Sequence, residues 1–178
     1  MPTDFSFTDE HEQLRSTLRA FLEKNSDEAA VRTQMATEIG YDALVWEQMA
    51  EQMGLAGLII PEEYGGAGYT FIELLVVMEE MGRALLCAPF LGTAVLASSA
   101  LLESGEEAFR KDLLVGIAAG QTLATVAHAE PNGVWDIAGI EMRAEATEGG
   151  FWEIRSTKIE NNSVFRGYFT PLTRLHSK

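Results

Sequence analysis

The sequence predicts an α+β protein, in which an amino-terminal all-α helical domain is followed by part of an antiparallel β-domain. Apolar residues recur at helical spacing over residues 8–119. After Gly120 the spacing changes to the two-residue period of half-buried strands. This change predicts a helical domain over residues 1–120, a partial β-domain over 121–160 and an irregular tail over 161–178.

The first predicted helix begins after Thr8. Its hydroxyl can cap the helix, and the acidic residues that follow suit the positive end of the helix dipole. Leu14, Leu18, Phe21 and Leu22 share one face of this helix. We expect that face to pack into the core.

Two further helices are predicted in the middle of the chain. One covers residues 41–53 and ends before Gly54, because glycine readily adopts the left-handed conformation at a helix end. Its apolar face carries Tyr41, Leu44, Val45, Met49 and Met53. The other covers residues 70–87 and opens with a capping box made by Thr70 and Glu73. The apolar run after that box predicts a largely buried helix.

Two more helices complete the predicted all-α domain. Pro89 favours the start of a helix over residues 90–103, and two glutamates open another over 106–118. The least polar stretch, residues 88–102, is shorter than the roughly 20 apolar residues that a membrane span needs. It is therefore predicted to be a core helix and not a membrane span.

The segments after Gly120 predict a β-hairpin. Over residues 140–147, apolar and polar side chains alternate, and the apolar set is Ile140, Met142, Ala144 and Ala146. Residues 151–158 alternate in the same way. The short stretch "EGG" at 148–150 joins the two segments, so we expect an antiparallel pair.

Charge and cysteine content restrict the function classes. The formal net charge is −14, and both nucleic acid and anionic membranes require clustered Lys and Arg, so neither is an expected partner. Cys87 is alone and cannot form an internal disulfide, and no charged and then apolar leader opens the sequence. We therefore expect a cytoplasmic protein, with Cys87 as a small buried residue on a helix.

Single residues do not identify a reaction. The stretch "PEEYGGAG" at 61–68 lacks the lysine of a phosphate-binding P-loop and is expected to be a tight turn. The spacing of His11, His128 and His176 does not match a zinc site, so no metal site is predicted. Adjacent acidic pairs such as that at 79–80 point apart on a helix and are interpreted as solvated charge.

The order of the motifs is more informative. The chain contains "GLAGLIIPEEYGGAGYTFIELLVVMEEMGRALL", then a helical stretch, then "ATVAHAEPNGVWDIAGIEMRAEATEGGFWEIRSTK". Over about residues 5–158 this order resembles the amino-terminal part of the acyl-CoA dehydrogenase family. The resemblance implies a helical domain followed by a β-domain, with the P-E-E-x-G-G-x-G turn linking two helices.

The resemblance also implies a site for FAD. Glu130, Pro131 and Asp136 match the family's T-E-P-x-x-G-S-D loop, which wraps the flavin ring. The positions implied to contact FAD are Val126, His128, Ala129, Val134, Trp135, Glu160 and Asn162. Ala129 and Trp135 replace the threonine and serine whose side chains contact the flavin in the family. Trp135 also occupies the position that meets the acyl-CoA substrate.

A second part of the flavin site departs further from the family. Residues 152–158 match W-x-I-x-G-x-K except that Ser156 replaces the glycine. The aromatic-Ile-Thr segment that backs the flavin ring in the family is Glu160, Asn161 and Asn162 in this chain. Because both walls of the pocket are altered or missing, the chain by itself is expected to retain FAD weakly or not at all.

The implied activity is FAD-dependent α,β-dehydrogenation of an acyl-CoA thioester. The family's catalytic base comes from a carboxy-terminal helical domain, and no acid of this chain matches its motif, so no catalytic residue is assigned. Implied partners are an acyl-CoA, further subunits of the same type in a homo- or hetero-oligomer, and an electron-transfer flavoprotein. The alternative is a non-catalytic truncated product or an accessory subunit that associates with a full-length acyl-CoA dehydrogenase.

Overall fold

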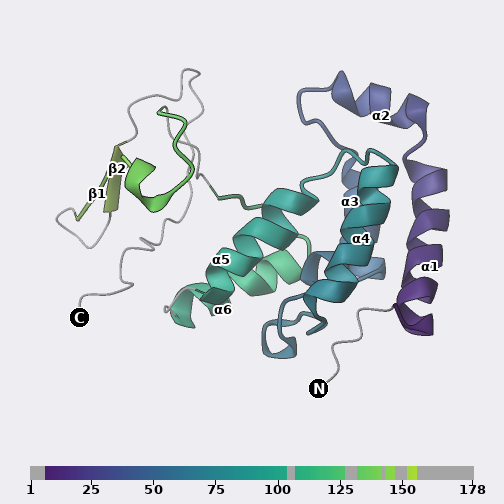
Figure 1. Ribbon diagram of the computed structural model, residues 1–178, viewed down its shortest axis with the longest axis horizontal. Coiled ribbons are helices and arrows are strands. Elements are labelled where there is room, and N and C mark those ends of the chain that lie inside the picture. The colour runs from purple at the N-terminus through teal and green to yellow at the C-terminus, as the bar shows by residue number, and fades with distance from the viewer. Residues whose placement is uncertain (1–6, 104–106, 127–131, 142, 147–151, 156–178) are drawn as a thin grey trace. The chain divides into compact units, whose positions relative to one another are not determined.

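The computed structural model describes residues 7–103, 107–126, 132–141, 143–146 and 152–155. The chain divides into two compact units, Met1–Val126 and Ala127–Lys178. We call them the helical unit and the second unit, and each is described by itself. Figure 1 shows the helices of the first and the two short strands of the second.

The helical unit confirms the predicted all-α domain. Its elements are α1 (Asp9–Asn25), α2 (Glu28–Met35), α3 (Ala43–Glu47), η1 (Gln48–Gln52), η2 (Leu55–Gly57), η3 (Glu62–Tyr64), α4 (Phe71–Arg83), η4 (Leu91–Ala97), α5 (Ser98–Glu103) and α6 (Glu107–Ala118). The elements η1 and η4 are π-helices, and η2 and η3 are short 3-10 helices.

Helix α2 is absent from the sequence prediction. No side chain of α2 is buried, so the apolar periodicity that reveals the other helices is missing. The local signal is Asp27, whose carboxylate accepts the backbone N–H of Ala30 as an N-cap. A cap alone did not distinguish this helix from a turn.

The predicted helix over 41–53 is divided between α3 and η1. It ends at Gly54, which has a φ of 67°, as predicted. The predicted apolar face is wrong at Leu44, which is 68% exposed, while Trp46 is buried in its place. Trp46 lies three and four residues before the buried Met49 and Ala50 and therefore shares their side of the helix, whereas Leu44, two residues before Trp46, points away from that side.

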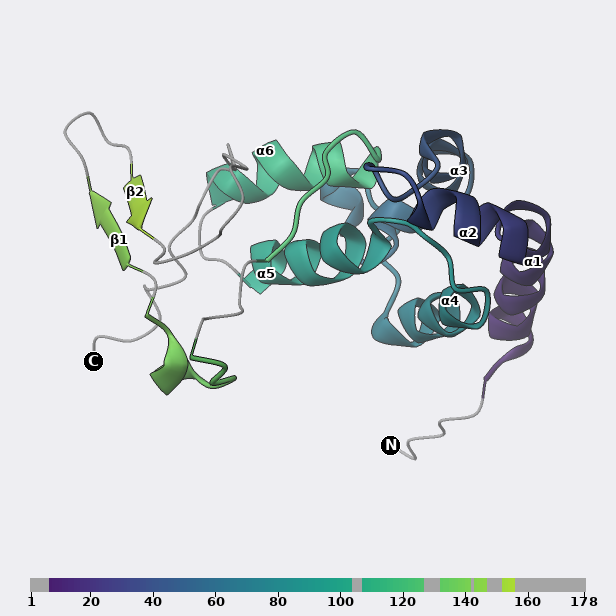
Figure 2. The ribbon, with the colours of Figure 1, turned by 90° about the horizontal axis from the view of Figure 1, so that it is seen from above.

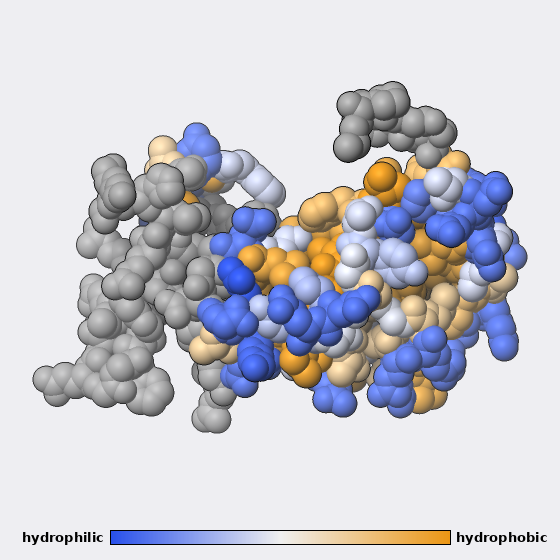
Figure 3. Space-filling view, turned by 90° about the horizontal axis from the view of Figure 1, so that it is seen from below, coloured by the Kyte–Doolittle hydropathy of each residue, from blue (hydrophilic) through white to orange (hydrophobic). Residues whose placement is uncertain are grey.

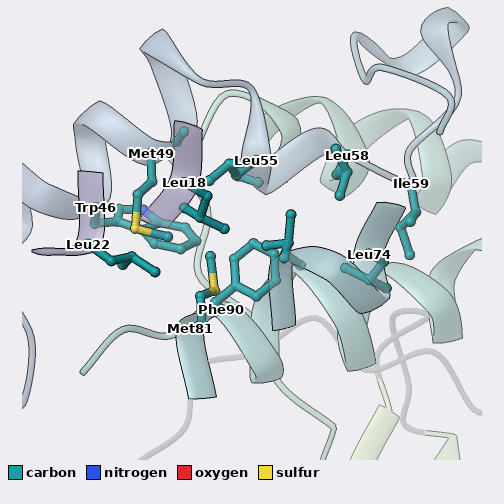
Figure 4. Packing of buried hydrophobic residues seen from close by; sticks show 14 residues of the cluster. Leu18, Leu22, Trp46, Met49, Leu55, Leu58, Ile59, Leu74, Met81 and Phe90 are labelled. Atoms are coloured by element: carbon teal, nitrogen blue, oxygen red, sulfur yellow. The ribbon is translucent and has the colours of Figure 1, made fainter. Parts of the chain in front are cut away.

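The core of the helical unit forms where α1, α3, η1, η2 and α4 meet. Its largest cluster includes Leu18, Leu22, Trp46, Met49, Leu55, Leu58, Ile59, Leu74, Met81 and Phe90. Figure 4 shows the sulfur atoms and rings of this cluster pointing toward one another. A smaller cluster between η3, α5 and α6 contains Ile60, Leu114 and Ile117, all fully buried.

Helices α1 and α4 lie side by side in the same direction (Figures 1 and 2). His11 contacts Glu73 near both helix starts, and Ser26 donates to the carbonyl of Ala84 near both ends, at 3.1 Å. Parallel neighbouring helices place like ends of their dipoles together, which is unfavourable. Charged side chains along this contact between α1 and α4, which we call the seam, offset this cost.

Glu80 is the centre of that seam and corrects the sequence interpretation. Its side chain is only 1% exposed, so the pair at 79–80 is not simply solvated charge. Arg19 binds the carboxylate through two nitrogens at 2.5 and 2.9 Å, Arg83 at 3.0 Å and Arg15 at 3.3 Å. These hydrogen bonds, led by those of Arg19, lower the pKa of Glu80 to about 2 although burial opposes the shift.

The amino-terminal caps of α1 and α4 are joined by one hydrogen bond. Thr8 caps α1 with His11 as its reciprocal partner, and Thr70 caps α4 with Glu73. The backbone N–H of Thr8 donates to Nδ1 of His11, which leaves Nε2 to donate to Glu73 at 3.0 Å. Burial raises the pKa of Glu73, but hydrogen bonds from Thr70 and His11 outweigh it and lower the pKa to about 2.

The carboxyl groups of the seam make folding stability depend on pH. Glu73 and Glu80 both have a pKa near 2 in the folded chain against 4.5 for an unshifted carboxyl. Their contribution is complete above pH 4.5 and is lost as the pH falls toward 2. We expect the urea midpoint to fall progressively over this window. In Glu73→Gln this loss should be smaller, and an equal loss in both proteins would contradict the assignment.

Part of α4 is exposed, which corrects the prediction that this helix is largely buried. Phe71 is 67% exposed, and Ile72 and Leu75 are exposed as well. Figure 3 shows hydrophobic residues reaching one face of the helical unit among hydrophilic ones. Cys87 is half-buried in the loop after α4, so its predicted place on a helix is also wrong. Among the described residues, no helix is long and apolar enough to cross a membrane.

The second unit contains η5 (Ile137–Gly139), β1 (Arg143–Ala146) and β2 (Trp152–Arg155). The two strands pair antiparallel, with Arg143 opposite Arg155 and Ala146 opposite Trp152. This confirms the predicted antiparallel pair. That the pair begins a larger β-domain stays a prediction.

Candidate functional site

The segment that leads into the predicted flavin loop is held by the helical unit. Trp46 donates its indole N–H to the carbonyl of Gly120 at 2.9 Å. The backbone N–H groups of Gln121 and Thr122 both donate to the carbonyl of Gly116. Further on, the buried hydroxyl of Thr93 bonds both backbone groups of Ala124. The backbone is therefore fixed up to two residues before Val126.

Two glycines let this segment approach the helices closely. A Cβ on Gly92 would lie 3.2 Å from the hydroxyl of Thr125, and a Cβ on Gly116 would collide with that of Thr122. Glycine in a helix interior is unfavourable by about 1 kcal/mol relative to alanine. The close approach of the Thr125 and Thr122 side chains is the structural reason for both glycines.

In the described part of the predicted flavin loop, residues 132–141, the backbone is braced by its own side chains. Asn132 accepts the backbone N–H of Val134 at 2.9 Å and donates to the carbonyl of Gly139 at 2.8 Å and to Glu141 at 2.9 Å. Such asparagine turns favour one local conformation. These bonds hold the loop backbone in one conformation and so position the side chains on it.

Asp136 and Gly139 further stabilise this loop. The carboxylate of Asp136 accepts the N–H of Ala138 at 2.8 Å, and its carbonyl accepts that of Gly139, which caps η5. Gly139 is buried against Val134, and a Cβ there would lie 2.5 Å from the Cβ of Val134. Asp136 thus has a structural role in this loop.

Three of the predicted FAD contacts lie in described residues. Trp135 is 82% exposed and Val134 is 42% exposed, both on the loop braced by Asn132. Val126 is half-buried at the end of the helical unit. The other predicted contacts, His128, Ala129, Glu160 and Asn162, lie outside the described residues.

Sequence reasoning missed Asn132 and Thr93. Asn132 precedes a glycine, the pattern of a tight turn, and Gly133 does take a φ of 68°. Thr93 had no such signal, because its partner Ala124 is 31 residues away. The carboxyl groups with strongly lowered pKa among the described residues, Glu73 and Glu80, lie in the seam of α1 and α4 and serve structure.

Comparison with known proteins agrees with this architecture. The family model for the acyl-CoA dehydrogenase N-terminal domain matches residues 8–121. Acyl-CoA dehydrogenase IpdE2 of Mycolicibacterium smegmatis is 41% identical over 149 residues, which cover 82% of this chain and 46% of that protein.

Solved structures show the same similarity. A variant of the Tcur3481-Tcur3483 steroid ACAD is 32% identical with a TM-score of 0.71, covering 82% of this chain and 39% of that one. An acyl-CoA dehydrogenase complexed with FAD from Bacillus anthracis is 25% identical with a TM-score of 0.70, covering 88% and 26%. The chain spans less than half the length of each of these three relatives. The family model covers most of the helical unit, and the chain belongs to the acyl-CoA dehydrogenase family.

Proposed function

We propose that this chain supplies an FAD-dependent acyl-CoA dehydrogenase with its helical amino-terminal domain (1–120), the start of its β-domain (121–160) and a flavin-contacting loop. The reaction is α,β-dehydrogenation of an acyl-CoA thioester. The observation that carries the proposal is the exposure of Val134 and Trp135 on a braced loop, at the positions that the resemblance assigns to the flavin site.

The residues of this loop fit a flavin through side chains more than through the backbone. The exposed ring of Trp135 offers a flat apolar surface on which an aromatic ring can stack, and Val134 adds apolar area beside it. The N–H of Val134 already donates to Asn132, so it is not offered to a ligand. Bound FAD would supply the hydride acceptor of the reaction. Val126, His128, Ala129, Glu160 and Asn162 complete the proposed contacts.

Partners are proposed from the relatives. The structure from Bacillus anthracis is named as complexed with FAD, and the steroid ACAD is named for two proteins, Tcur3481 and Tcur3483. We therefore propose FAD as cofactor, an acyl-CoA as substrate and assembly with a second subunit of the same family, with an electron-transfer flavoprotein as acceptor. No residue of this chain is proposed as the catalytic base, so an accessory subunit is the second candidate function.

Replacing Trp135 tests the flavin contact. The change Trp135→Leu should weaken FAD binding about two- to tenfold, because stacked aromatic pairs contribute about 0.5–1.5 kcal/mol beyond their area. The measurement is a titration of FAD followed by flavin fluorescence anisotropy. The control is Tyr69→Leu, an exposed aromatic of the helical unit, which should bind FAD like the unaltered chain.

Two outcomes would overturn the proposal. The proposal requires FAD binding that is weak but saturable, so an absence of saturable binding by the unaltered chain would remove the flavin from the proposed function. Equal weakening by Trp135→Leu and Tyr69→Leu would remove the assigned role of Trp135.

A further inference from the structure

Thr93 lies in the π-helix η4 (Leu91–Ala97). In η4 the backbone N–H of Ser98 bonds the carbonyl of Thr93, five residues earlier, and the hydroxyl of Ser98 bonds the same carbonyl at 3.1 Å. Single π-helical turns are rare and frequently occur at functional sites. The side chain of Thr93 is fully buried, so its hydroxyl must find a partner within the chain.

That partner is the backbone of one distant residue. The hydroxyl of Thr93 donates to the carbonyl of Ala124 at 2.9 Å and accepts the N–H of Ala124 at 3.1 Å. One side chain thereby replaces both bonds that a neighbouring strand would make to Ala124. The absence of a side chain on Gly92 leaves room for Thr125 beside this contact.

Only one residue, Thr125, separates Ala124 from Val126, which ends the helical unit and is proposed to contact FAD. Because each residue adds two soft backbone dihedrals, fixing Ala124 strongly restricts where Val126 can lie. The bonds to Gly116 and Gly120 fix the segment at its other end. The segment from Gly120 to Ala124 is therefore held at both ends.

We propose that Thr93 is a positioning residue for the cofactor site, whose hydroxyl clamps Ala124 and so sets the backbone at Val126. This inference rests on the proposed function. It assigns Thr93 a role toward the cofactor without contact with it, through a segment that belongs to the same unit.

The clamp is tested with Thr93→Val, which keeps the shape of the side chain and removes the hydroxyl. Hydrogen–deuterium exchange of the Ala124 amide should become about tenfold faster, as expected for the loss of one buried hydrogen bond. The affinity for FAD should fall about three- to tenfold. Thr93→Ser keeps the hydroxyl and should restore both.

The matched control is Ser98→Ala. Ser98 is a fully buried hydroxyl of the same helix region that does not bond Ala124, so the change should lower stability without altering Ala124 exchange or FAD affinity. Equal effects of both variants on FAD affinity would show a merely structural role. Unchanged exchange of Ala124 in Thr93→Val would overturn the clamp itself.

The exchange measurement also separates this inference from the proposed function. Faster exchange of Ala124 with unchanged FAD affinity would overturn the positioning role while leaving the flavin site intact. Absence of FAD binding by the unaltered chain would overturn the proposed function and the cofactor role together, and the clamp would then be purely structural.

Discussion

Glu80→Gln is expected to destabilise the chain by about 3 kcal/mol. Removing one partner of a buried ion pair costs roughly 3–5 kcal/mol, because the remaining charge loses its compensation. The lower end applies because Arg19 and Arg83 are half-exposed and can regain water. Glutamine keeps the volume, but its amide would present N–H groups to arginine donors.

The matched control for Glu80 is its neighbour Glu79. Its side chain is 58% exposed and pairs with Arg15 at 2.6 Å, so Glu79→Gln should cost less than about 1 kcal/mol. Urea unfolding followed by circular dichroism at 222 nm measures both variants. Equal midpoints for the two variants would contradict the role of Glu80 as the centre of the seam.

Gly66→Ala is expected to destabilise the chain by about 3 kcal/mol or more. A Cβ at this position would collide with the carbonyl oxygen of Ile60 and lie 2.5 Å from its carbonyl carbon and Cβ. Ile60 is fully buried in the smaller core cluster and cannot move aside. Overpacking against backbone costs typically 1–3 kcal/mol and more where nothing can shift.

The same substitution at Gly82 should have the opposite sign. Gly82 lies inside α4, and a Cβ there would meet no atom within 4 Å. Gly82→Ala should therefore stabilise the chain by about 0.5–1 kcal/mol, because alanine loses less backbone entropy in a helix. Thermal unfolding of both variants is the measurement. A lower Tm for Gly82→Ala, or an unchanged Tm for Gly66→Ala, would contradict the packing described for these two positions.

Several structural features follow from short-range sequence signals. Thr70 and Glu73 predicted the start of α4, Gly54 predicted the end of η1, and the alternation after Gly120 predicted the strand pair. Each depends on residues within a few positions of one another, because caps, turns and side-chain periodicity are local properties. The order of such motifs was also enough to indicate the family.

Tertiary structure alone decided the roles of Glu80 and Thr93. From the sequence, Glu80 is interpreted as solvated charge. In the fold it is buried and bonded by Arg15 and Arg19, which are more than 60 residues away along the chain. Thr93 likewise finds Ala124 only after folding. A side chain's burial and partners depend on which distant segments pack beside it, and periodicity along the chain contains no information about that choice.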